Sequence, residues 1–153
     1  SSGPPEPDRM YRRILVPIEH SRFDVFILEH VRGLARHCGA ELVLLHVADG
    51  FAARNLHQLA LRDSEEMRGD RAYIQRIVNG LLADGFKAEA LLATGDPAKE
   101  IVAAARRENC DLIAMATHGH RWLQDIFRGS TASAVRHESD IPVLFVRGVP
   151  DRG

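Results

Sequence analysis

The chain has little cysteine, and this shortage excludes two ways of stabilising a fold. Among its 153 residues there are only two cysteines, Cys38 and Cys110. They lie far apart in sequence, which suits neither a disulfide framework nor a metal-binding knuckle. We therefore expect both to be buried as small apolar residues.

The chain also lacks net charge and long apolar runs. Lysine and arginine number 20 against 21 aspartates and glutamates, a net charge of −1. No overall positive field exists to hold a nucleic-acid backbone or an anionic membrane, so any anion site must be local. No stretch approaches the roughly 18 apolar residues of a membrane-spanning helix, and the N-terminus does not resemble a secretory signal. We expect a cytoplasmic protein whose partners include neither nucleic acid nor a membrane interior.

What the chain does contain is typical of a globular domain. Hydrophobic residues make up 45% and charged residues 27%, which excludes disorder of the whole chain. The length suggests one domain with a core large enough to fold without metal or disulfides. Residues 1–9 are rich in proline and indicate a flexible leader, tag or linker. We expect a single domain over residues 10–148 and a tail over 149–153.

Short apolar runs alternate with stretches of helical spacing along this domain. The runs are of the kind made by strands buried on both faces. The expected strands are 13–18, 41–47, 86–93, 111–116 and 142–146. The expected helices run from Ser21 or Asp24 to Gly39, over 63–83, from Asp96 to 108 and over 129–137, with a loop or irregular helix over 48–62.

Local signals mark the ends of several of these helices. Gly39 and Gly85 follow helical stretches, where a left-handed residue commonly ends a helix. Asp96 is a typical N-cap, and Pro97 suits the first helical position.

Strands that alternate with helices imply right-handed crossovers and a parallel sheet covered on both faces. The sequence therefore predicts a doubly wound, Rossmann-like α/β fold, a three-layer sandwich. Such sheets bind ligands beyond the carboxyl ends of their strands, where the strand order reverses. The loops of interest follow Pro17, Val47, Ala93 and Ala116.

The most informative segment follows the fourth expected strand. Gly119 and Gly129 lie between this strand and the last helix. Glycine lets a backbone approach a ligand closely, and the free amides at a helix start favour a phosphate. The alternative is a glycine in an ordinary loop and Ser130 as an ordinary N-cap. The spacing alone leaves both interpretations open.

This segment resembles the nucleotide signature of the universal stress protein family. That signature is Gly, two residues, Gly, nine residues, then Gly followed by Ser or Thr, and the chain has Ala116, Gly119 and Gly129-Ser130 at these positions. The resemblance extends over roughly residues 10–147 and implies a five-stranded parallel sheet of the adenine nucleotide alpha-hydrolase-like type. It is carried by Arg13-Ile14-Leu15-Val16-Pro17, Leu44-Leu45-His46-Val47, Gly95-Asp96-Pro97 and Pro142-Val143-Leu144.

The resemblance implies a stress-response regulatory module that binds ATP or a related adenine nucleotide, with any Mg²⁺ arriving on the phosphates. In ATP-binding members the turn after the first strand contacts adenine and ribose, the end of the second strand reads the adenine edge, and the signature holds ribose and phosphates. Carried over by position, the binding residues are Pro17, Ile18, Glu19, Val47, Ala116, His118, Gly119, Gly129, Ser130 and Thr131.

Two departures from the family pattern keep alternatives open. Ala116 replaces a glycine, and Glu19 stands where the family usually has Asp. The alternatives are a nucleotide-free dimeric interaction module, a regulatory domain excised from a larger protein such as a transporter, and a slow ATPase. No motif specifies catalytic residues. His118 and His120 have only Asp125 as a third ligand nearby, so we expect no protein-held metal.

The last expected strand is apolar almost without interruption, yet the family's strand order places it at a sheet edge. Such an edge must be covered or paired. The family usually pairs the last strands of two subunits about a twofold axis, which implies a homodimer. The alternative is a monomer in which a loop or the tail over residues 147–153 folds over the edge.

Overall fold

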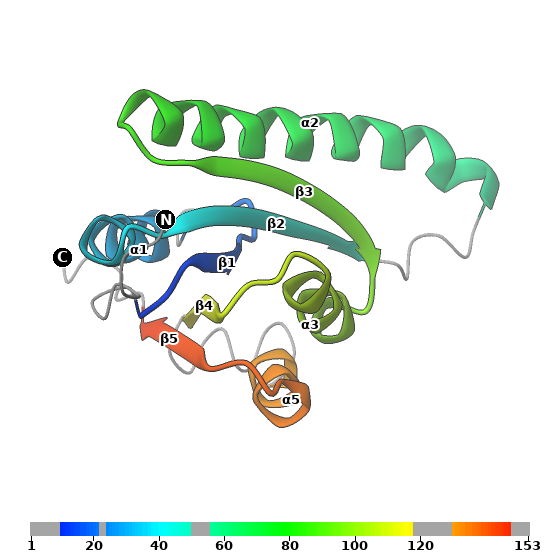
Figure 1. Cartoon of the computed structure of the whole chain (residues 1–153). Coiled ribbons are helices and arrows are strands. Elements are labelled where there is room, and N and C mark those ends of the chain that lie inside the picture. Colours follow the sequence, from blue (N-terminus) through cyan, green and yellow to red (C-terminus); the bar gives the residue numbers. More distant parts are fainter. Residues whose placement is uncertain (1–9, 22–23, 50–55, 118–129, 148–153) are drawn as a thin grey trace, which may run out of the picture.

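Five parallel strands lie between two layers of helices in a computed structural model of the chain (Figure 1). The structure describes residues 10–21, 24–49, 56–117 and 130–147, with 49, 56–67, 117 and 130–132 described by their backbone alone. The elements in chain order are β1 (Arg13–Pro17), α1 (Asp24–Cys38), β2 (Glu41–Asp49), α2 (Leu56–Ala83), β3 (Ala88–Gly95), α3 (Pro97–Arg107), β4 (Leu112–Thr117), α5 (Ser130–Glu138) and β5 (Val143–Arg147).

The strand order in the sheet is β3-β2-β1-β4-β5, and all four pairings are parallel. The chain moves outward from β1 to β3 and then crosses back to β4, so the order reverses between β1 and β4. Helices α1 and α2 cover one face of the sheet, and α3 and α5 cover the other. The predicted three-layer, doubly wound fold is confirmed. No helix among the described residues is long and apolar enough to span a membrane.

Alternate residues of the central strands supply two cores, one on each face. Ile14 and Val16 of β1 pack with the α1 and α2 layer, whereas Leu15 between them packs with the α3 and α5 layer. All three are fully buried. Burial on both faces explains why these strands read as continuous apolar runs. Cys38 and Cys110 are also buried and unpaired, as predicted.

Three helices end with the same arrangement, in which a left-handed residue follows the helix and the next amide bonds back to its last turn. The left-handed residues are Gly39 (φ 69°), Gly85 (φ 94°) and Asn109 (φ 58°). The amides of Ala40, Phe86 and Cys110 donate to the carbonyls of Ala35, Leu81 and Ala105 at 3.0, 3.0 and 2.9 Å. The predicted ends at Gly39 and Gly85 are confirmed, as is Asp96, whose side chain accepts from the Lys99 amide.

Two predicted boundaries are wrong. Helix α2 begins at Leu56, so residues 56–62, which were expected to be loop or irregular helix, are regular helix. Its Leu, Gln, Ala and Arg residues have high helix propensity, which a search for apolar periodicity does not detect. Strand β3 begins at Ala88 rather than at Phe86. Phe86, 9% exposed, packs in the core as part of the α2 end instead.

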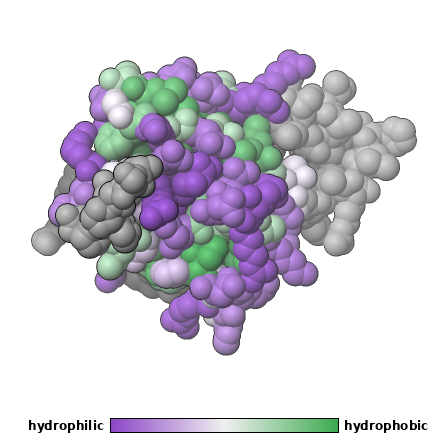
Figure 2. Space-filling model, in the orientation of Figure 1, coloured by the Kyte–Doolittle hydropathy of each residue, from purple (hydrophilic) through white to green (hydrophobic). Residues whose placement is uncertain are grey.

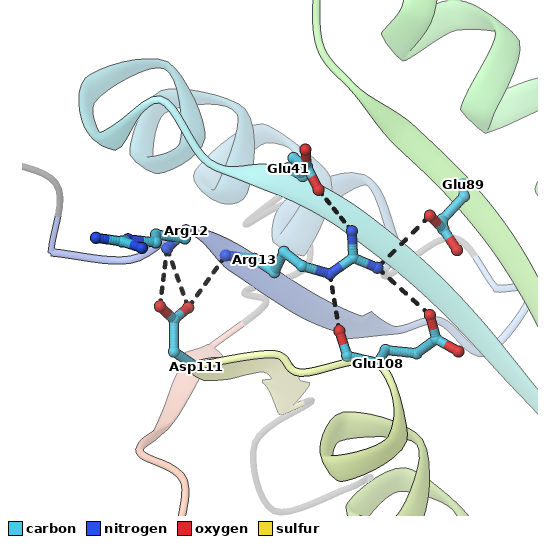
Figure 3. Close-up of polar contacts among 6 residues, drawn as sticks. All are labelled: Arg12, Arg13, Glu41, Glu89, Glu108 and Asp111. Carbon is cyan, nitrogen blue, oxygen red and sulfur yellow. Dashed lines mark hydrogen bonds and ion pairs between the residues drawn. The ribbon is translucent and has the colours of Figure 1, made fainter. Parts of the chain in front are cut away.

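Arg13 joins several elements at the amino ends of the strands (Figure 3). Its guanidinium lies 2.5 Å from Glu41, 3.5 Å from Glu89 and 3.4 Å from Glu108. Burial lowers the pKa of Arg13, but the hydrogen bond to Glu41 and the surrounding negative charges outweigh it and raise the pKa overall. The cluster therefore stays charged and holds β1, β2, β3 and the end of α3 together.

Asp111 closes the same end of the sheet. Its carboxylate accepts from the backbone amides of Arg12 and Arg13 at 2.9 to 3.1 Å, just before β4 begins. A pocket of about 550 Å³ opens nearby, bordered by the ends of α1 and α2. This pocket lies at the end of the sheet opposite the carboxyl ends of the strands.

Candidate functional site

Strands β1 and β4 separate at their carboxyl ends, where the strand order reverses. Their pairing includes only Ile14 with Leu112 and Leu15 with Ile113, although β1 continues to Pro17 and β4 to Thr117. On its other side the end of β1 stays bonded to β2, because the Ile18 amide donates to the Leu45 carbonyl at 2.8 Å. This point of divergence is where doubly wound sheets receive ligands.

Five of the predicted binding residues lie around this point. Pro17 ends β1, and Ile18 and Glu19 follow it. Continuing the β1–β2 register places Glu19 level with Val47, and continuing the β1–β4 register places Ile18 level with Ala116. Ala116 is 6% exposed and Ile18 is 3% exposed, so both side chains are buried at this end of the sheet.

The remaining predicted residues lie between the end of β4 and the first turn of α5. Ser130 and Thr131 are the first two residues of α5, where helix amides have no partner within the helix. His118, Gly119 and Gly129 lie outside the described residues. The structure therefore leaves the phosphate half of the predicted site as a prediction.

A buried carboxylate fixes the turn after β1. Asp24 is 2% exposed, and its Oδ1 accepts from the Glu19 amide at 2.9 Å. Its Oδ2 accepts from the Ser21 amide at 3.1 Å and from the Tyr73 hydroxyl at 2.6 Å. Asp24 was expected as one candidate cap of α1. It is instead the first residue of the helix, and its side chain bonds back to the turn.

Tyr73 supports this carboxylate from α2. Burial raises the pKa of Tyr73, and the hydrogen bond and negative charge of Asp24 raise it further. The phenol therefore keeps its proton at neutral pH and remains a donor to Asp24.

A second set of contacts ties the same turn to α2. His46, near the end of β2, places Nδ1 3.0 Å from the Ile18 carbonyl oxygen and Nε2 3.0 Å from Asp70 Oδ2. His20 places Nδ1 2.7 Å from the other oxygen of Asp70. The His20 ring also stacks on Tyr73 with centroids 4.0 Å apart. His20 has a left-handed backbone, with φ of 62°, so these contacts hold a conformation that few residues adopt.

A role for His20, His46, Asp70 or Tyr73 was not predicted from the sequence. One signal was present, since His46 is a polar residue inside the apolar run of β2. Asp70 and Tyr73 are also three positions apart on α2, which places them on one helix face. Within the described ranges, no group of three histidine, cysteine or acidic side chains has a geometry that could hold a metal ion.

Comparison with known proteins agrees with this architecture. Residues 10–147 match the model of the universal stress protein family. The chain is 30% identical to universal stress protein MJ0577 of Methanocaldococcus jannaschii over 155 residues, covering 90% of this chain and 96% of that protein. The solved structure of MJ0577 superposes with a TM-score of 0.76 over the same shares of the two chains.

Two further relatives extend the comparison. A universal stress protein of Thermus aquaticus is 30% identical over 138 residues, covering 90% of this chain and all of that protein. The universal stress protein of Archaeoglobus fulgidus, solved in complex with dAMP, is 20% identical with a TM-score of 0.62, covering 89% of this chain and 98% of that chain. The chain belongs to the universal stress protein family.

Proposed function

We propose that this universal stress protein binds ATP or a related adenine nucleotide at the carboxyl ends of β1, β2 and β4 and acts as a regulatory module. One observation carries the proposal. The pairing of β1 with β4 stops at Leu15 and Ile113, at the reversal of strand order, and the ends of both strands lie beside this opening.

The geometry of the turn supports recognition of an adenosine. The Glu19 and Ser21 amides are occupied by Asp24, so the turn is held in one shape before any ligand arrives. A preformed turn lowers the entropic cost of binding. The same fold holds dAMP in the Archaeoglobus fulgidus protein.

The phosphates are assigned to Gly119, Gly129, Ser130 and the start of α5 by the family signature. Backbone amides at a helix N-terminus suit negative charge, and Mg²⁺ is usually bound through phosphates and water. The proposed unit is the whole domain over residues 10–148.

Calorimetry with ATP tests this proposal. We expect wild type to bind and Gly129→Val to lose binding, because a branched side chain blocks close approach of a phosphate. Gly33→Val is the matched control, since a Cβ at this exposed position in α1 meets nothing within 4 Å. Equal binding by wild type and folded Gly129→Val contradicts the phosphate assignment.

The competing function is a nucleotide-free interaction module, and Ala116 is the residue that favours it. Its methyl stands where the family signature has none, at a buried position. The double variant Ala116→Gly and Glu19→Asp restores the family pattern. Tighter ATP binding by this variant supports the nucleotide site, whereas no binding by either protein favours the interaction module.

We also propose a homodimer through β5. The order of the sheet leaves β5 at an edge, and Val143, Leu144, Phe145 and Val146 are each only partly buried. Some apolar surface is visible between polar residues in the lower half of Figure 2. Pairing with a second β5 would satisfy this edge.

A further inference from the structure

The contacts of His46 determine how many protons it shares with Asp70. Nδ1 lies 3.0 Å from the Ile18 carbonyl oxygen, which only accepts, so Nδ1 carries a hydrogen. Nε2 lies 3.0 Å from Asp70 Oδ2. A carboxylate also only accepts, so either Nε2 carries a second hydrogen or the hydrogen sits on Asp70. In both cases the pair holds one proton more than a neutral imidazole beside an ionised carboxylate.

The pair lies in a partly buried cluster of polar side chains. The side chains of His46 and Asp70 are only 14% and 16% exposed. His20 approaches the other Asp70 oxygen at 2.7 Å and donates through Nδ1 without needing a second proton. Beyond these groups lie Tyr73 on α2 and Asp24 on α1, and Tyr73 is occupied as a donor to Asp24.

Loss of the proton leaves His46 Nε2, which is then an acceptor, facing the Asp70 carboxylate, which is also an acceptor. The imidazole would then have one hydrogen for two oxygens, the Ile18 carbonyl and the Asp70 carboxylate. One of the two contacts must break, because an unpaired acceptor facing a carboxylate in a partly buried site is unfavourable. Either break loosens the turn, directly at Ile18 or through Asp70 and its partner His20.

We infer that His46 and Asp70 are positioning residues, which hold the nucleotide-binding turn through a shared proton and so make adenine-nucleotide binding weaken as the pH rises. This inference rests on the proposed nucleotide site. Ile18 is central to it, since its carbonyl is held by His46 and its amide by Leu45. The orientation of the turn thus depends on the protonation of a pair that is not among the proposed binding residues.

The sign of this pH dependence follows from the thermodynamic linkage between proton binding and nucleotide binding. The ordered turn holds the proton, and the nucleotide binds the ordered turn, so affinity is full at low pH and declines as the proton is lost. Reciprocity requires that nucleotide binding favours uptake of the same proton. Histidine residues in general change charge between about pH 5 and 8, which sets the range to measure.

The test measures dissociation constants for ATP and for adenosine at several values between about pH 5.5 and 8.5. Adenosine has no phosphate, so its pH dependence excludes titration of the ligand's phosphates. Across this range we expect the wild-type dissociation constants to rise roughly tenfold. His46→Asn retains a donor near Nδ1 but cannot take up a second proton, so its affinity should be nearly independent of pH. His37→Asn, at an exposed histidine near the end of α1, is the control and should keep the wild-type dependence.

Failure of this inference and failure of the nucleotide proposal give different results. Equal pH dependence in wild type and His46→Asn, with both binding, overturns the inference and leaves the nucleotide proposal standing. Absence of binding at every pH defeats the nucleotide proposal together with its regulation. Asp70→Asn, which removes the charge but not the side-chain volume, carries the same test if His46→Asn does not fold. Ring ¹⁵N spectra of His46 provide a readout without ligand, and a single protonated nitrogen below pH 6 beside an ionised Asp70 overturns the inference.

Discussion

The Tyr73 hydroxyl donates a 2.6 Å hydrogen bond to Asp24 Oδ2, which ties α2 to the first residue of α1. The same carboxylate accepts from the Glu19 and Ser21 amides, so one buried charge has three donors. A charge that is 2% exposed requires such compensation. The proposed binding turn is therefore supported by a helix that is not itself adjacent to it in sequence.

Removing this hydroxyl should destabilise the protein. We expect Tyr73→Phe to lower the free energy of unfolding by about 2 kcal/mol, which is within the usual range for a hydrogen bond to a charged group. Tyr11→Phe is the control, because no hydrogen bond of the Tyr11 hydroxyl occurs among the described residues, and it should change stability little. Urea unfolding of both variants measures the difference, and equal effects would show that the Tyr73–Asp24 bond contributes no net stability.

Replacing each of two glycines near the end of α2 by alanine should change the stability of the protein in opposite directions. Gly85 has φ of 94°, where a Cβ is strained whatever the space around it. Gly80 lies within the helix, and a Cβ there meets nothing within 4 Å. We expect Gly85→Ala to destabilise by about 1 kcal/mol and Gly80→Ala to stabilise by about 0.5 to 1 kcal/mol. Thermal unfolding of the two variants checks the signs, and a stabilised Gly85→Ala would contradict the role of Gly85 in ending the helix.

The parts of the fold that follow from local rules were predictable from the sequence. Gly39, Gly85 and Asp96 mark helix ends through backbone conformation and capping, which depend on a few neighbouring residues. The alternation of apolar runs with helical stretches was enough to predict the layers, and the edge position of the last strand came from the family's strand order. The position of α2 was only partly predictable, since its first residues have helix propensity without an apolar stripe.

The network behind the binding turn was not predictable because its members are distant in sequence. Asp24 and Tyr73 are brought together only when α1 and α2 pack on the same face of the sheet. His46 and Asp70 likewise meet only when β2 and α2 pack against each other. Sequence periodicity places each residue on a face, but it does not determine which side chains on two elements meet.

Stability at high pH should depend on Cys110. Burial raises the pKa of the Cys110 thiol to about 11, although Arg13 opposes the shift. Between about pH 8.5 and 11 the folded state keeps a proton that the unfolded chain loses, so the free energy of unfolding falls as the pH rises. The contribution of this thiol has a slope of at most about 1.4 kcal/mol per pH unit.

Comparison of Cys110→Ala with wild type isolates this effect. We expect the variant to lose part of the alkaline decline in the free energy of unfolding. Unfolding in urea across this pH range provides the free energies. Parallel curves for wild type and Cys110→Ala would show that the thiol does not contribute.

The proposed dimer makes a prediction about the open edge of β5. The Ile113 amide donates to the Pro142 carbonyl at 3.0 Å, which identifies the residues of β5 that face β4. Since backbone groups alternate in direction along a parallel strand, the amides of Val143, Phe145 and Arg147 point to the open edge. Arg147 is exposed, so a change there spares the core.

Proline at position 147 should therefore weaken the dimer without unfolding the subunit. Arg147→Pro removes one outward amide from each subunit, and twofold symmetry doubles the loss. At about 1 kcal/mol per hydrogen bond, we expect the dimer dissociation constant to rise tenfold or more. Arg147→Ala removes the same charge but retains the amide, so it should dimerise like wild type. Sedimentation equilibrium measures all three proteins, and a wild type that stays monomeric at high micromolar concentration, or equal dissociation constants for the two variants, would exclude pairing through this edge.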